Sequence, residues 1–90
     1  MSDFFRLIVL STNSFGEFGT DSLVCPNLEY AYRVGNDCCQ SENVYGYVII
    51  KMMKDTWQVV SESVYGCDYT IYEHNGIVNV KEGRDKIVLV

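Results

Sequence analysis

The sequence predicts an α+β fold in which one helix packs on one face of a mostly antiparallel sheet of about five strands. Three observations indicate this class: an apolar run near the N-terminus, a helical period in the next third, and a second half rich in β-branched and aromatic residues. The expected order is a strand, a loop, the helix and then five strands. With 48 % hydrophobic and 21 % charged residues, the ninety-residue chain has the composition of one globular domain over residues 1–90.

The first predicted strand covers Phe4–Leu10, where Arg6 alone interrupts an apolar run. Such a run is typical of a central strand that is buried on much of both faces. Residues 12–24 are expected to form a loop or a short edge strand, because Gly16 and Gly19 argue against a helix.

A helix is predicted from Pro26 to about Gln40, with Glu29 in its first turn. A strand is the competing interpretation, because apolar residues also alternate between residues 28 and 34. The helical pattern continues further along the chain, so we favour the helix. Its apolar face would carry Leu28, Ala31, Tyr32, Gly35, Cys38 and Cys39.

The remaining chain is predicted to form strands separated by turns. Asn75-Gly76 is the strongest short hairpin signal in the sequence, and Lys54-Asp55 is expected to form another turn. The five predicted strands are Val44–Met53, Thr56–Glu62, Asp68–His74, Ile77–Lys81 and Lys86–Val90.

Catalytic residues are not recognisable in the sequence, and we expect no enzyme and no cofactor. The single histidine, His74, adjoins the predicted Asn75-Gly76 turn, and an exposed hairpin tip holds a general base poorly. The acidic residues are scattered singly, and no phosphate-binding or dinucleotide-binding motif is present.

The four cysteines are expected to be reduced thiols in a cytoplasmic protein. No secretory signal and no membrane-spanning run is visible in the sequence, so we expect no membrane association. Zinc binding is the alternative, with His74 as an extra ligand, but the close C-x2-C pairs of structural zinc sites are missing. We therefore predict no metal site at Cys25, Cys38, Cys39 and Cys67.

The net charge of −5 is concentrated in the first half, where residues 1–50 hold six acids and two bases. Because nucleic-acid binders normally carry a basic stripe, no direct contact with nucleic acid is expected. An acidic surface favours a basic protein partner, including one that itself binds nucleic acid. Glu17, Asp21 and Glu29 are the candidate acidic patch, although solubility alone is the simpler explanation for any single acid.

Strand alternation about the Lys54-Asp55 turn divides the next two strands into two faces. Val48, Ile50, Met52, Trp57 and Val59 would form an apolar face covered by the helix. The opposite face is expected to be exposed, and it is the second candidate partner-binding site. Its residues are Tyr45, Tyr47, Ile49, Lys51 and Val60. Aromatic and aliphatic side chains together are typical of protein-binding patches, but cross-strand packing would also account for them.

We therefore expect a small, acidic, non-enzymatic protein-binding module. The combination of size, charge and missing chemistry fits an inhibitor, encoded by a phage or mobile element, that acts on a host nucleic-acid-handling or defence protein. One alternative is a structural, self-associating subunit, for example a homo-oligomer joined by a sheet edge. The second is a single-stranded nucleic-acid binder that stacks bases on the aromatic sheet face.

Overall fold

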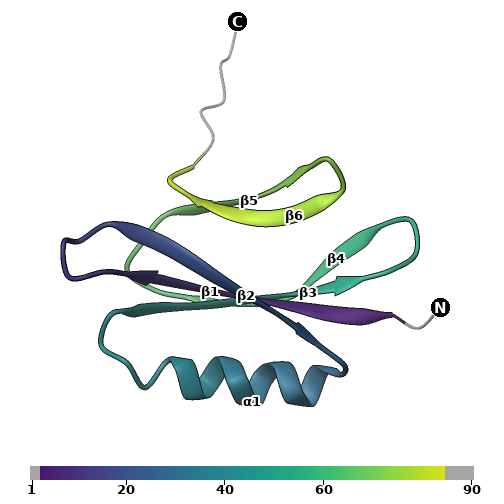
Figure 1. Ribbon diagram of the computed structural model, residues 1–90, viewed down its shortest axis with the longest axis horizontal. Helices are drawn as coiled ribbons and strands as arrows, with labels where there is room; N and C mark the ends of the chain where they lie inside the picture. The colour runs from purple at the N-terminus through teal and green to yellow at the C-terminus, as the bar shows by residue number, and fades with distance from the viewer. Residues whose placement is uncertain (1–2, 85–90) are drawn as a thin grey trace, which may run out of the picture.

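The computed structural model describes residues 3–84, which form a helix, a four-stranded sheet and a two-stranded hairpin in three layers (Figure 1). The four-stranded sheet lies in the middle, with the helix on one face and the hairpin on the other. The elements are β1 (Phe4–Thr12), β2 (Phe18–Cys25), α1 (Leu28–Cys38), β3 (Val44–Met52), β4 (Trp57–Val64), β5 (Tyr69–His74) and β6 (Ile77–Glu82).

β1 and β3 form the centre of the four-stranded sheet, whose order is β2-β1-β3-β4 with every neighbouring pair antiparallel. The buried residues 7–10 of β1 and 47–50 of β3 point alternately to the two faces, so both faces must be covered. The predicted central strand at Phe4–Leu10 is confirmed, and it extends to Thr12.

The predicted helix is also confirmed. Asn27 caps its N-terminus: the side-chain oxygen accepts a hydrogen bond of 2.8 Å from the backbone N–H of Tyr30. Glu29 lies in the first turn, where a negative charge suits the helix dipole. Ala31 and Gly35 are the buried residues of α1, and they face the sheet.

Tyr47 of β3 joins the sheet to the helix. Its ring lies against Gly35, where an added Cβ would be only 2.9 Å from the Tyr47 Cγ atom. Its hydroxyl donates a hydrogen bond of 2.8 Å to the Asn36 side-chain oxygen. The ring therefore fills the space that a larger residue at position 35 would need.

The β5–β6 hairpin covers the other face of the four-stranded sheet. Its turn is the predicted Asn75-Gly76, where both residues have positive φ, 51° and 79°. Such values match the twist of a two-residue hairpin. The buried residues of this second core are Ile8, Leu10, Val48, Ile50, Val78 and Val80.

The predicted single sheet of about five strands is imprecise, because the described residues form six strands in two sheets. Residues 12–24 were expected to form a loop or short edge strand, and they contain all but the last residue of the eight-residue edge strand β2. The predicted strand at Lys86–Val90 lies outside the described residues.

The assignment of the sheet faces needs a larger correction. The apolar set from Val48 to Val59 does share one face, but the hairpin covers it and the helix does not. The exposure predicted for the opposite face is wrong for Tyr47 and Ile49, which belong to the core beneath α1. Alternation groups residues by face, but it does not state which layer covers each face.

Two β-bulges adjust the alternation in the sheet. Tyr45 is the extra residue opposite Leu10 and Ser11 of β1, and Val60 is the extra residue opposite Ile49 and Ile50 of β3. Tyr45 consequently packs on the hairpin side, where its ring stacks with Phe18 at a centroid distance of 6.5 Å. The Val60 bulge brings Glu62 opposite Val48, on the hairpin side as well.

We predict that Tyr47→Ala lowers the free energy of unfolding by about 3–5 kcal/mol, as expected for removing a buried aromatic ring. Tyr47→Phe keeps the ring and loses the hydrogen bond to Asn36, so it should cost about 1 kcal/mol. Urea denaturation of both variants measures the difference. A loss below about 1 kcal/mol for Tyr47→Ala would show that the ring is not part of the core.

Gly46→Ala is predicted to destabilise the protein by more than about 2 kcal/mol. A Cβ at this position would overlap the Ser63 carbonyl oxygen and lie 2.7 Å from the Val64 Cα, at a φ of +146°. Gly19→Ala is the matched control, because a Cβ there meets no atom within 4 Å, and it should change stability by about 0.5 kcal/mol or less. Equal melting temperatures for the two variants would contradict the close approach of β3 and β4.

Candidate functional site

The residues predicted as a partner-binding sheet face do not form one exposed surface. Tyr47 is only 5 % exposed and Ile49 is fully buried, both beneath α1. Tyr45 is half-buried on the opposite side of the sheet, and Lys51 is half-buried beside Asp3, at 3.7 Å. Val60 is exposed (38 %), at the β4 bulge. The correction has two physical causes: the helix covers Tyr47 and Ile49, and the bulge at Tyr45 turns that residue to the hairpin side.

The three predicted acidic residues are all exposed, but they do not lie on one element. Glu17 directly precedes the strand, Asp21 lies within it, and Glu29 lies in the first turn of the helix that follows it. With a rise of about 3.3 Å per residue, Glu17 and Asp21 are roughly 13 Å apart. Glu17 and Asp21 therefore lie in a row along the strand and do not form a compact cluster.

β2 is an edge strand of the four-stranded sheet, and within residues 3–84 its ladder partner is β1 alone. Two large apolar side chains are exposed on it, Leu23 at 43 % and Val24 at 59 %. Together with Glu17 and Asp21 they form what we call the β2 surface. Sequence reasoning missed Leu23 and Val24, although the β-branched residues of this segment were a signal for a strand.

The turn that leads into β2 is held by one side chain. The Asn13 side-chain oxygen accepts hydrogen bonds from the backbone N–H groups of Phe15 and Glu17, at 2.9 and 3.0 Å. Its amide group donates to the Glu17 carboxylate at 3.0 Å. This arrangement fixes the turn while Phe15 at its tip is 86 % exposed. Phe15 is thus a second feature that the sequence did not single out.

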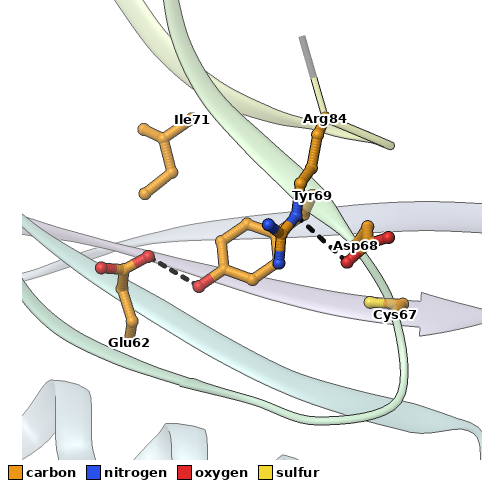
Figure 2. Close-up of a pocket in the computed structure, with 6 residues that line it drawn as sticks. All are labelled: Glu62, Cys67, Asp68, Tyr69, Ile71 and Arg84. Atoms are coloured by element: carbon orange, nitrogen blue, oxygen red, sulfur yellow. Dashed lines mark hydrogen bonds and ion pairs between the residues drawn. The ribbon is translucent and has the colours of Figure 1, made fainter. Parts of the chain in front are cut away.

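A pocket of about 290 Å³ lies between β4 and the start of β5 (Figure 2). In Figure 2 the Tyr69 hydroxyl points to the Glu62 carboxylate, to which it donates a hydrogen bond of 2.6 Å, and Arg84 points to Asp68, at 3.2 Å. These contacts tie the hairpin to β4 and to the chain between β4 and β5. Cys67 and Ile71 complete the lining.

The titrating groups of this pocket are poorly suited to catalysis. Burial, the hydrogen bond to Glu62 and the Glu62 charge raise the pKa of Tyr69 to about 12, so its hydroxyl keeps its proton at neutral pH. Burial raises the pKa of the Cys67 thiol, and the charges of Asp68 and Glu82 raise it further. A protonated thiol is a weak nucleophile, and no histidine or lysine is among the lining residues to activate it. Two pairs of lining side chains, Tyr69 with Glu62 and Arg84 with Asp68, make contacts that hold this part of the fold together.

The four cysteines are free in the structure, and Cys25 is the buried one among them. Burial raises the pKa of the Cys25 and Cys39 thiols, and Cys38 adds to the effect at Cys39. Across residues 3–84 no three potential ligands among His, Cys, Asp and Glu gather into a metal-binding group.

Comparisons with protein-family models, with curated proteins and with solved structures find no match for this chain. In the described part of the chain, no helix is long and apolar enough to cross a membrane.

Tyr69 should be among the last tyrosines to ionise, with a pKa of about 12. Its value lies above the ordinary pKa of about 10 for an unfolded tyrosine. The contribution to stability is therefore complete below pH 10 and is lost as the pH rises towards 12. Glu62→Gln should lower the pKa of Tyr69, because it removes the carboxylate charge.

The measurement is a pH titration of the tyrosine ring carbons by NMR, with Glu73→Gln as the control. Glu73 accepts a hydrogen bond from Trp57 and not from a tyrosine, so this control should leave the pKa of Tyr69 unchanged. An unshifted Tyr69 in Glu62→Gln would contradict the contact shown in Figure 2.

Proposed function

We propose that this protein is a small, acidic, non-enzymatic binding module that attaches to a basic protein through the β2 surface. The observation that carries the proposal is the edge strand β2, which places exposed Leu23 next to Asp21 on the helix side of the sheet and exposed Val24 on the other side of the same edge, with Glu17 just before the strand. Exposed apolar residues supply contact area, and the surrounding charge selects a partner of opposite sign. The pocket of Figure 2 supports a non-enzymatic role, because its groups pair with one another.

The row of acids favours a partner whose surface is rich in lysine or arginine. Such a surface is typical of proteins that bind nucleic acid. We therefore propose that the partner is a nucleic-acid-handling or defence protein of a host cell, and that this chain inhibits it in the cytoplasm by occupying its basic surface. An origin in a phage or mobile element is part of the same proposal and is supported by the small size and acidic charge alone.

A self-associating structural subunit is the second candidate, because an open sheet edge can pair with a second copy. The acids along β2 argue against it, since two copies would bring like charges together. The alternative of base stacking on an aromatic sheet face loses its basis, because Tyr47 is buried and Tyr45 is half-buried.

The proposed function predicts that reversing two β2-surface charges abolishes binding, while reversing two charges elsewhere does not. Immobilised wild type, the double variant Glu17→Lys with Asp21→Lys, and the control Asp55→Lys with Glu82→Lys would each be exposed to a host lysate. Both double variants change the net charge equally, and all four acids are exposed.

Basic proteins should bind the wild type and the control, and they should be lost from the Glu17→Lys, Asp21→Lys variant. With a purified partner, association should slow as salt rises, because charge steering is screened. Equal loss in both double variants would reduce the effect to net charge, and capture of acidic or neutral proteins alone would contradict the proposal.

A further inference from the structure

The backbone of β2 alternates between the two sides of the strand, and one set of its groups faces outward. The Asn13 N–H donates to the Glu17 carbonyl at 3.0 Å, which fixes the alternation at the start of the β1–β2 ladder. The backbone N–H and C=O groups of the odd-numbered residues of β2 therefore form hydrogen bonds with β1, as in the pairs Val9↔Asp21 and Leu7↔Leu23. The N–H and C=O groups of Thr20, Ser22 and Val24 point away from β1, to the open edge.

This edge has few of the features that usually block strand pairing, and Asp21 is its one charged side chain. β2 pairs with β1 over eight residues without a register shift, and it contains no proline and no lysine. The other edge strand, β4, is different, because the Val60 bulge interrupts its ladder with β3. In addition, its Glu62 accepts a hydrogen bond from Tyr69. Of the two edges of the four-stranded sheet, β2 is the regular and accessible one.

We propose that a basic, extended segment of the partner protein adds to the sheet as an antiparallel strand beside β2. This inference rests on the proposed function, and it names the form in which the partner is recognised. Main-chain hydrogen bonds to Thr20, Ser22 and Val24 supply the attachment, and alternating side chains supply the specificity.

The side chains of β2 define what the added strand should carry. Asp21 and Leu23 pair with Val9 and Leu7, so they lie on the helix side of the sheet, two residues apart. An antiparallel partner strand with an apolar residue and then, two residues later, a lysine or arginine would place these opposite Leu23 and Asp21. A second copy of this chain fits poorly, because its own β2 contains Asp21 and no base.

The first test is hydrogen exchange of the full-length protein alone, followed by NMR. Amides of Thr20, Ser22 and Val24 should exchange rapidly, and those of Asp21 and Leu23 slowly. Uniform protection in dilute protein would show that the edge is already occupied, and protection that grows with protein concentration would assign it to a second copy. Either result would overturn the proposal.

The second test is a titration with the peptide acetyl-Thr-Lys-Thr-Val-Thr-Lys-Thr-amide. With its valine opposite Leu23, one lysine lies opposite Asp21, and its two inner threonines pair with Ser22 and Val24. N-methylation of these two threonines removes the N–H groups that face β2 and should weaken binding at least about tenfold, because two main-chain hydrogen bonds are lost. N-methylation of the two lysines blocks the far side of the peptide and should leave binding within about twofold.

A protein variant provides an independent control. Thr20→Pro removes an outward N–H opposite the last threonine of the peptide, which an edge strand tolerates, so the fold should persist while peptide binding weakens. Thr20→Ala removes the side chain and keeps the N–H, so it should bind as the wild type does.

The outcomes separate this inference from the proposed function. Equal binding of the two N-methylated peptides would show attraction by charge alone, and strand addition would be wrong while a basic partner remained. Failure of the unmodified peptide to shift the β2 amides would also overturn strand addition. Failure of the lysate experiment to retain basic proteins would overturn the proposed function itself.

Discussion

Val48, Ile49 and Ile50 are consecutive in β3, so their side chains point alternately to opposite faces of the sheet, and all three are fully buried. A sheet with such a central strand is unstable unless both faces are covered. The chain meets this requirement with α1 on one face and the β5–β6 hairpin on the other. Each apolar face buried in this way stabilises the fold by about 25 cal/mol per Å² removed from water.

The helix layer depends on one close contact, and the hairpin layer depends on the bulges. Tyr47 occupies the space above Gly35 and bonds Asn36, so a single side chain sets how closely α1 approaches the sheet. On the other face, the Val60 bulge brings Glu62 to the side on which Tyr69 can donate to it. The same bulge interrupts the regular pairing between β3 and β4. The bulge that allows Tyr69 of the hairpin to donate to Glu62 therefore also makes β4 the less regular edge of the sheet.

Because both faces of the four-stranded sheet are covered, its open main-chain groups lie at the edges. The large apolar side chains of β3 are used in the two cores, whereas the edge strand β2 has an outward-facing main chain and exposed side chains. An edge strand offers hydrogen bonds in a fixed direction, and the acids beside it offer a charge preference. A small domain with two cores can recognise a protein in this way.

Local signals in the sequence determined the α+β class, the central strand, the helix, the Asn75-Gly76 hairpin and the shared face of Val48 and Ile50. Each of these depends on residues close together in the chain, through periodicity, capping or turn geometry. Glu17, Asp21 and Glu29, the candidate acidic patch, are all exposed in the structure. The tertiary structure alone decided which layer covers which face, because alternation is the same whether a helix or a hairpin lies above it. For that reason Tyr47 and Ile49 became core, and β2, which local glycines had made look irregular, became the open edge.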